Sequence, residues 1–322
     1  MLPPIVSYVI AAHNHETFIE ALLQSALDQT LPDIEVIVID DGSTDKTLEV
    51  ARRAADRDSR IAVYSQANSG VVAARNAGMK RSSAPYISVV DSDELLPRDR
   101  TEKMARALDA NPAASLVYGD AMVMRSEEGS SFRFFETYPP VPGPISEALF
   151  CNYCFVPAGS VMFRRAAWER TGPFWGPGPN SDYLKWIELG MQGEAICLED
   201  EVLGTWRLHG ENVSQADAVI RCQQYDALCQ ALMALMGKYP EFARQIGRAR
   251  QSHRYSRCYV MAGFYAGREY LWSLARAQFA LALSHERSLI NLASWLSTFP
   301  GLRYPGKIAC DWAAKRFLRK FA

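Results

Sequence analysis

The chain has 322 residues, of which 48% are hydrophobic and 22% are charged, and these proportions are typical of globular proteins. Its 35 lysines and arginines nearly balance 36 aspartates and glutamates, so the formal net charge is −1. A dedicated nucleic-acid-binding protein would normally be basic, so we expect no nucleic-acid partner. At roughly 100–200 residues per domain, the length predicts about two domains.

The cysteines and the first residues of the chain predict a cytoplasmic protein. The seven scattered cysteines, an odd number, indicate reduced thiols rather than a framework of disulfides. The first residues lack the positive charge that begins a secretory signal. No stretch approaches the ~20 apolar residues that are needed to span a bilayer.

The first third of the chain alternates strand-like and helix-like segments. Runs rich in isoleucine and valine predict strands, and they lie at 5–10, 34–39, 61–64, 86–90 and 115–118. Segments with helical spacing separate them, at 17–29, 47–55, 71–80 and 98–110. This order predicts an α/β fold, with a mostly parallel sheet that is covered by helices on both faces.

The helix predicted at 17–29 has a clear apolar pattern. Five residues recur at intervals of three and four along it, so they share one face, which we expect to be the packed face. These residues are Phe18, Ala21, Leu22, Ser25 and Ala26.

The regular alternation of strands and helices weakens after residue 119. The proline-rich stretch at 139–144 predicts a loop, and residues 146–215 mix short apolar runs with Gly/Pro turns. Helical spacing then dominates from residue 216 onward. It is clearest at 225–236, 243–251 and 268–284.

Polar clusters directly follow four of the predicted strands. Ligands of parallel α/β sheets bind beyond the carboxyl ends of the strands, so these clusters should converge on one crevice. They lie at 13–15, 40–45, 68–70 and 91–94.

Two of these clusters are acidic. Asp91 and Asp93 could both approach a divalent cation or a ribose–diphosphate, and oxygen ligands suit Mg²⁺ or Mn²⁺. A solvated acidic turn is the alternative, because so short a pattern recurs by chance. In the 40–45 cluster, Ser43 or Thr44 can cap the following helix, and a carboxylate could accept hydrogen bonds from a nucleobase or a ribose.

Together these segments resemble glycosyltransferase family 2. The resemblance rests on segments that occur in the family's order and cover about residues 1–215: 8–14, 40–45, 68–78, 91–93, 158–165, 181–186 and 206–214. It implies a GT-A-like, Rossmann-type fold and an inverting enzyme that uses a nucleotide sugar. Two positions depart from the family pattern, since Ala11 replaces a usual proline and His13 a usual tyrosine, so stacking on His13 could replace the tyrosine ring.

The resemblance also implies roles for single residues. Asp182 would be the general base that deprotonates the acceptor hydroxyl, and Asp93 with His209 would hold Mg²⁺ or Mn²⁺ against the diphosphate. The nucleotide would be bound by Ala11, His13, Asn14, Asp41, Asn68, Arg75, Asp91 and Ser92. The alternatives are a surface helix charge for Arg75 and a loop histidine without a ligand for His209.

We therefore expect transfer of a sugar from a nucleotide-diphosphate sugar, a UDP-sugar, to a hydroxyl of a glycan or lipid-linked acceptor. The resemblance suggests a place in bacterial surface polysaccharide biosynthesis. Two other classes remain open: a metal-dependent nucleotidyltransferase, and a non-catalytic nucleotide- or glycan-binding protein of the same fold. The nucleotidyltransferase would usually need a glycine-rich, basic loop after the first strand, and residues 11–14 contain none.

These patterns predict a catalytic domain at 1–215, with a nucleotide-binding half at 1–119 and an acceptor half at 120–215. They predict a helical region at 216–322, for which an acceptor site, a homodimer contact and a membrane contact all remain open. Its last residues, 301–322, hold six basic residues and one acidic residue. An amphipathic helix at 307–322 could lie on the inner face of the cytoplasmic membrane, and an ordinary docked helix is the alternative.

Overall fold

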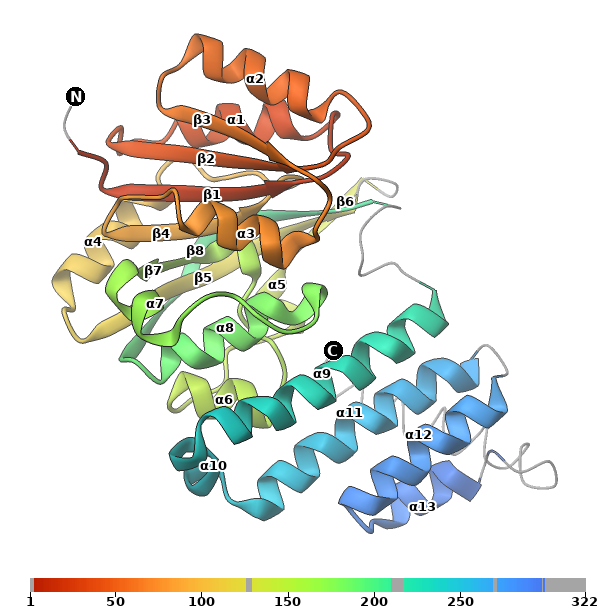
Figure 1. Cartoon of the computed structure of the whole chain (residues 1–322). Helices are drawn as coiled ribbons and strands as arrows, with labels where there is room; N and C mark the ends of the chain where they lie inside the picture. The colour runs from red at the N-terminus through yellow and green to blue at the C-terminus, as the bar shows by residue number, and fades with distance from the viewer. Residues whose placement is uncertain (1–2, 126–128, 210–216, 269–270, 297, 299–322) are drawn as a thin grey trace. The chain divides into compact units, whose positions relative to one another are not determined.

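The computed structural model describes residues 3–125, 129–209, 217–268, 271–296 and 298 (Figure 1). The predicted membrane-contacting helix at 307–322 lies outside these described residues. The chain divides into two compact units. One consists of Met1–Leu149 with Cys154–His209, and the other of Phe150–Tyr153 with Gly210–Ala322.

An eight-stranded sheet forms the centre of the first unit, in the order β3-β2-β1-β4-β7-β5-β6, with β8 paired to β5. Strands β1 to β4 are parallel to one another and β8 is parallel to β5, whereas β6 and β7 pair antiparallel with their neighbours. The predicted mostly parallel sheet is therefore confirmed. The strands are β1 (Val6–Ala12), β2 (Ile34–Asp41), β3 (Ile61–Gln66), β4 (Tyr86–Asp91), β5 (Ala114–Arg125), β6 (Ser130–Arg133), β7 (Val161–Arg164) and β8 (Glu194–Leu208).

The register of the central strands brings their polar ends to one edge of the sheet. Ala12 of β1 pairs with Asp40 of β2, and Ala11 of β1 pairs with Asp91 of β4. Strands β2 and β3 lie on one side of β1 and β4 lies on the other, so the order reverses between β1 and β4. Such a reversal opens a crevice at the carboxyl ends of the strands, which is where α/β proteins bind ligands.

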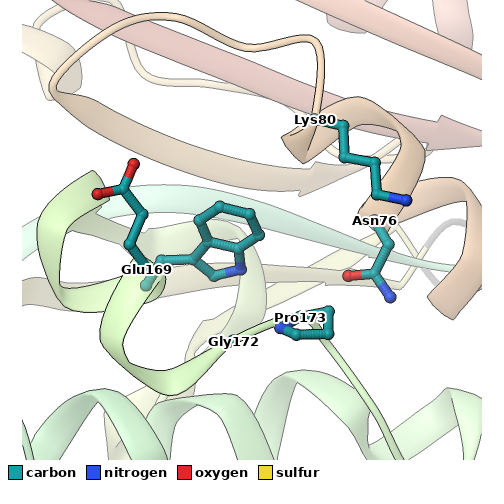
Figure 2. A pocket seen from close by; sticks show the side chains of 6 residues that line it. Asn76, Lys80, Glu169, Gly172 and Pro173 are labelled. Carbon is teal, nitrogen blue, oxygen red and sulfur yellow. The ribbon is translucent and has the colours of Figure 1, made fainter.

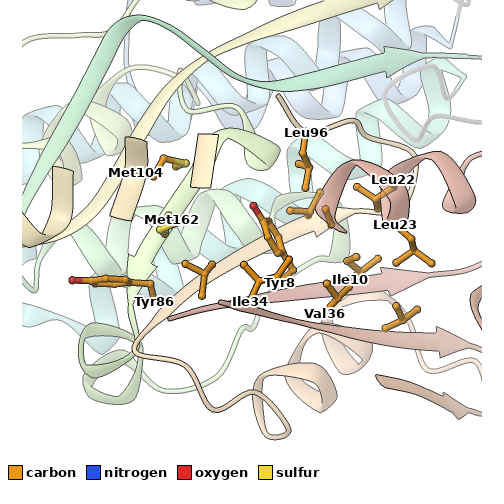
Figure 3. Packing of buried hydrophobic residues seen from close by; sticks show 14 of the residues in the cluster. Tyr8, Ile10, Leu22, Leu23, Ile34, Val36, Tyr86, Leu96, Met104 and Met162 are labelled. Carbon is orange, nitrogen blue, oxygen red and sulfur yellow. The ribbon is translucent and has the colours of Figure 1, made fainter. Parts of the chain in front are cut away.

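Alternate residues of the strands face two different layers of helices. One face packs against α1 (Ile19–Leu27), α2 (Thr47–Arg57) and α4 (Arg100–Ala110). Figure 3 shows this core, in which Tyr8 and Ile10 of β1 lie among Leu22 of α1 and Met104 of α4. Burial of such large apolar side chains supplies most of the stability of the unit.

The other face of the sheet packs against α3 (Val71–Met79) through small side chains. Ala74 contacts Ile37 and Ile39 of β2, with further alanines at the edge of this cluster. Gly78 approaches β1 so closely that a Cβ atom there would lie 2.5 Å from Val9 Cγ1. This close approach brings the backbone of α3 against β1 and β2.

The second half of the first unit contains shorter elements and one long strand that the sequence did not predict. The loop predicted at 139–144 is confirmed. Residues 194–208, predicted as part of a segment of turns, form β8 instead, because pairing with β5 overrides their weak strand pattern. The helices here are α5 (Phe134–Thr137), α6 (Ile145–Cys151), α7 (Arg165–Thr171) and α8 (Ser181–Gly190), with 3₁₀ turns at Ala158–Ser160 and Gly178–Asn180.

The described part of the second unit is helical, as predicted. Its helices are α9 (Ala218–Lys238), α10 (Pro240–Ile246), α11 (Arg248–Arg268), α12 (Trp272–His285) and α13 (Leu289–Leu296). The continuous helix predicted at 243–251 is wrong, because Gly247 has a φ of 78° and ends α10 there. The helix predicted at 268–284 also begins too early, since α11 runs to Arg268. Among the described residues, no helix combines the length and the apolar character that a membrane crossing requires.

Helix α1 corrects another expectation. It begins at Ile19, and its buried residues are Ile19, Leu22, Leu23 and Ala26. Phe18 is the N-cap residue and is only half-buried, and Ala21 is exposed, so neither belongs to the packed face predicted for them.

The close packing of α3 on β1 yields a stability prediction. Replacing glycine by alanine within a helix normally stabilises it by about 1 kcal/mol. In Gly78→Ala, however, the added methyl group collides with Val9, and overpacking costs about 1–3 kcal/mol. We expect a net loss of about 1 kcal/mol in the free energy of unfolding, measured by urea denaturation followed by circular dichroism.

The matched control is Gly237→Ala in α9, where nothing lies within 4 Å of the added atom. This variant should be as stable as the wild type or slightly more stable. Equal effects at the two sites would contradict the close packing described for α3.

Candidate active site

Hydrogen bonds tie together the loops that follow β1 and β2. The backbone N–H of Asn14 donates to Ser43 Oγ at 3.0 Å, and Asn14 Oδ1 accepts the Thr44 N–H at 2.8 Å. The sequence predicts that Ser43 or Thr44 caps α2. This prediction is wrong, because neither side chain caps the helix. Instead Asp45 Oδ1 accepts the N–H of Thr47 in the first turn, at 2.9 Å.

Asp41, at the end of β2, organises the loop that follows β3. Its Oδ1 accepts hydrogen bonds from Gln66 Nε2 at 2.8 Å and from the Ser69 N–H at 2.9 Å. Its Oδ2 accepts the Gly70 N–H at 2.7 Å. A carboxylate offers about four acceptor positions, so one remains after these three contacts.

The residues predicted to bind the nucleotide base and ribose lie beside Asp41. His13 Nδ1 lies 2.9 Å from the Asp41 carbonyl oxygen, and its Nε2 lies 3.3 Å from Asn68 Nδ2. Ala11 is level with Asp91 on the neighbouring strand. The structure thus brings the polar ends of β1, β2 and β3 together, as the sequence predicted.

A buried arginine joins the end of β4 to the start of α8. Arg75 of α3 is 5% exposed, and its Nη2 lies 2.7 Å from Asp91 Oδ1. Its Nη1 donates to Ser181 Oγ at 3.0 Å, and Asp182 is the next residue of α8. The alternative of a surface helix charge for Arg75 is therefore wrong. The guanidinium of Arg75 therefore links the predicted nucleotide site to Asp182, the predicted general base.

The surroundings of Asp182 favour its neutral form. Burial raises the pKa of this carboxyl above its ordinary value, and the nearby charge of Asp91 raises it further, against the opposing charge of Arg75. Its Oδ1 accepts the backbone N–H of Tyr183 at 2.7 Å. A raised pKa makes an ionised carboxylate a stronger proton acceptor, which suits a general base.

A buried ion pair anchors the helix that carries Asp182. Lys185 and Glu188 are both fully buried, with Lys185 Nζ 2.5 Å from Glu188 Oε2. Lys185 Nζ also donates to the Gly172 carbonyl at 3.0 Å, and Trp175 Nε1 donates to Glu188 Oε1 at 2.8 Å. Helix α8 is therefore attached to the loop at 172–176.

The two predicted metal ligands meet at the switch point of the sheet. His209 directly follows β8, and its Nε2 lies 3.0 Å from Asp93 Oδ2. Ser92, between the two aspartates, is buried and contacts His15 Nδ1 at 2.6 Å. A carboxylate oxygen and an imidazole nitrogen fit Mn²⁺, and the oxygen alone suits Mg²⁺.

These two side chains would leave most of the coordination sphere of a cation to other ligands. Within the described ranges, no cluster of three or more His, Cys, Asp or Glu side chains could hold a metal ion. Cations that work on phosphates are commonly held by one or two protein side chains, with phosphate oxygens and water completing the sphere. The pair therefore fits a metal that binds together with a diphosphate.

Two further residues of this site, Glu94 and Gly159, have no role in the sequence-based prediction. Glu94 is buried, and burial together with the charges of Asp91 and Asp93 raises the pKa of its carboxyl well above the ordinary value. Its Oε2 packs so tightly on Gly159 that a Cβ atom there would lie 1.8 Å away. The acidic run at 91–94 was a signal for Glu94, and Gly159 lies in the segment 158–165 that carries the family resemblance, although that resemblance implied no role for the residue itself.

A hollow of about 260 Å³ lies beside α3 and α7, away from the acidic strand ends (Figure 2). None of the predicted site residues lines it, and it offers no acidic pair for a cation. Its lining residues are Asn76, Lys80, Trp168, Glu169, Gly172 and Pro173.

The comparison with protein families decides the classification. A family model described as glycosyl transferase family 2 matches residues 7–171, which is half of the chain. The chain belongs to this family. The predicted resemblance is confirmed.

Curated relatives match part of the chain. The uncharacterized glycosyltransferase EpsJ of Bacillus subtilis (strain 168) is 40% identical over 108 residues, covering 34% of this chain and 31% of EpsJ. Chondroitin synthase of Pasteurella multocida (strain Pm70) is 36% identical over 213 residues, covering 66% of this chain and 21% of that protein. The matches thus span a third or less of the length of these relatives.

Solved structures confirm the GT-A-like fold. TarS of S. aureus in complex with UDP-GlcNAc superposes with a TM-score of 0.58 at 18% identity, covering 93% of each chain. The mannosyltransferase PcManGT of Pyrobaculum calidifontis, in complex with GDP-Man and Mn²⁺, has a TM-score of 0.57 at 20% identity. It covers 98% of this chain and 88% of its own.

Arg75 yields a second stability prediction. Arg75→Met keeps the length of the side chain but removes two charge-assisted hydrogen bonds and leaves the carboxylates of Asp91 and Asp182 without their shared cation. We expect the free energy of unfolding at pH 7 to fall by about 3 kcal/mol, measured by urea denaturation.

Arg81→Met, just beyond the end of the same helix, is the control. Arg81 is exposed and donates to the Ala77 carbonyl, so its loss should change the free energy of unfolding by about 0.5 kcal/mol or less. A loss of equal size in both variants would show that the buried bridge has no special role.

Proposed function

We propose that the protein is an inverting glycosyltransferase. It transfers a sugar from a nucleotide-diphosphate sugar, a UDP-sugar, to a hydroxyl of a glycan or lipid-linked acceptor. The observation that carries the proposal is the bridge from Asp91 through Arg75 to Ser181, which sets acidic strand ends beside the carboxyl of Asp182.

In the proposed mechanism the nucleotide lies across the ends of β1, β2 and β3. His13, Asn14 and Asn68 surround the position of the base, and the remaining acceptor position of Asp41 receives a donor of the base or ribose. Asp91 lies next to Ser92 and Asp93 at the end of β4, toward the ribose and the diphosphate. Holding donor and acceptor in one geometry supplies a large share of the acceleration in such reactions.

Asp93 and His209 would hold the cation. When bound, Mg²⁺ or Mn²⁺ acts as a Lewis acid that stabilises the negative charge of the departing diphosphate.

Asp182 acts as the general base. Its carboxylate takes the proton of the acceptor hydroxyl while the hydroxyl oxygen forms a bond to the anomeric carbon and the bond from that carbon to the diphosphate oxygen breaks. One displacement from the opposite face inverts the configuration. The positive charge of Arg75 opposes the rise in the pKa of Asp182, so a larger fraction of Asp182 is ionised.

Several relatives support the substrate class. Solved structures of similar fold hold UDP-GlcNAc, or GDP-Man with Mn²⁺. Matching relatives include the putative teichuronic acid biosynthesis glycosyltransferase TuaG of Bacillus subtilis and the chondroitin synthase of Pasteurella multocida. We therefore propose a cytoplasmic role in bacterial surface polysaccharide biosynthesis, with a catalytic domain at 1–215.

A panel of nucleotide sugars tests the proposed reaction. With Mn²⁺ present, we expect hydrolysis of at least one UDP-sugar. Asp93→Ala should weaken binding of the Mn²⁺–UDP pair by at least about 100-fold in calorimetry, because a direct ligand is lost and even residues that only orient a ligand are worth about 10- to 100-fold. A nucleotidyltransferase would instead release pyrophosphate from a nucleoside triphosphate. Absence of turnover with every donor, together with unchanged binding by the variant, would refute the proposal.

The role of Asp182 as the general base predicts a loss of transfer activity without a loss of donor binding. Asp182→Asn should reduce transfer to an acceptor by about 10²- to 10⁴-fold while the affinity for the donor stays near that of the wild type. In the wild-type protein, kcat/KM should fall as the pH drops through the pKa of Asp182, which lies above the ordinary aspartate value.

Asp200→Asn, at an exposed position of β8, changes the net charge equally and should leave transfer unchanged. Retention of most activity by Asp182→Asn would show that another group takes the proton.

A further inference from the structure

His209 is enclosed by side chains that have no part in the proposed chemistry. The ring of Phe18 stacks on its imidazole, with 4.5 Å between the ring centroids and 22° between the planes. The ring of His15 approaches edge-on, at 6.1 Å and 87°. The guanidinium of Arg207 lies 4.8 Å from the centroid of the Phe18 ring.

The position of Phe18 is not explained by helix α1. Phe18 occupies the N-cap, where Ser, Thr, Asp and Asn are preferred because their side chains accept a backbone N–H of the first turn. No side chain caps this end of α1, and the helix packs on the sheet through Ile19, Leu22, Leu23 and Ala26. The half-buried ring of Phe18 contacts His209 instead.

The edge-on ring of His15 is itself fixed from two sides. Its Nδ1 lies 2.6 Å from Ser92 Oγ, and its backbone N–H donates to Thr47 Oγ1 at 2.7 Å. His15 is therefore held beside the imidazole of His209, with its own ring against Ser92.

Arg207 connects the stack to the other proposed metal ligand. Its Nε donates to the carbonyl oxygen of Asp93, and its Nη2 lies 3.3 Å from the Glu94 carbonyl and 3.5 Å from the Phe18 carbonyl. One guanidinium thus joins the segment that carries Asp93 to the residue that stacks on His209. Strand β8 supplies Arg207, and His209 directly follows the last residue of that strand.

We propose that Phe18 is a positioning residue for the metal site of the proposed function, on which this inference rests. Rotation of the His209 imidazole about its Cβ–Cγ bond would turn Nε2 away from Asp93 Oδ2, which lies 3.0 Å from it. The flat ring of Phe18 opposes that rotation and keeps Nε2 directed at Asp93 before a cation arrives. Metal sites need ligand orientations held within about 10–20°, and loss of the residues that orient ligands typically weakens metal binding about 10- to 100-fold.

Phe18→Leu tests this role, because leucine keeps an apolar side chain at the N-cap but removes the flat ring. The probe is Mn²⁺ in the presence of UDP, followed by electron paramagnetic resonance. We expect Mn²⁺ to bind about 10-fold more weakly than to the wild type, and the ¹⁴N coupling from the histidine to Mn²⁺ to weaken. Phe18→Tyr keeps the ring and should retain both the affinity and the coupling.

Tyr64→Leu is the matched control, since Tyr64 is a half-exposed aromatic residue of β3 and should leave Mn²⁺ binding unchanged. Wild-type affinity and ¹⁴N coupling in Phe18→Leu would overturn the positioning role alone, while the proposed metal site would stand. Absence of ¹⁴N coupling in the wild type would overturn the assignment of His209 as a ligand, and the role of Phe18 with it.

Discussion

The ion pair between Arg75 and Asp91 holds the candidate active site together. The guanidinium of Arg75 lies between the end of β4, which faces the proposed nucleotide, and helix α8, which begins with Ser181 and Asp182. Arg75 reaches this position because α3 packs on the sheet through Ala74 and Gly78, with little side-chain bulk between the two backbones. The small residues of α3 thus determine where the proposed donor site and the proposed general base, Asp182, meet.

The site also gathers carboxylates that repel one another. Burial and the charges of Asp91 and Asp93 raise the pKa of Glu94, and burial together with the charge of Asp91 raises the pKa of Asp182, so ionisation of all four carboxyls is unfavourable. The buried cation Arg75 offsets part of this repulsion, and the raised pKa of Glu94 favours its neutral form. A divalent cation at Asp93 and His209 would offset more, which couples metal binding to the electrostatics of the whole cluster.

The sequence predicted the first half of the fold well because β1 to β4 are continuous apolar runs with polar residues directly after them. It also predicted that Asp93 and His209 belong to one site, through the family resemblance. It could not predict β8, whose half-buried residues alternate poorly and depend on β5 for pairing. Apolar spacing placed Phe18 in the core, whereas its ring lies on His209, a contact between residues far apart in the chain.

A crystal structure with Mn²⁺ and a non-hydrolysable UDP-sugar would test whether one inverting displacement takes place at the ends of β1 to β4. We predict the cation bonded to Asp93 Oδ2 and His209 Nε2. We also predict the Asp182 carboxylate on the face of the sugar opposite the diphosphate, with Arg75 still bridging Asp91 and Ser181. A donor bound elsewhere, or an Asp182 carboxylate on the same face as the diphosphate, would contradict a single inverting displacement at this site.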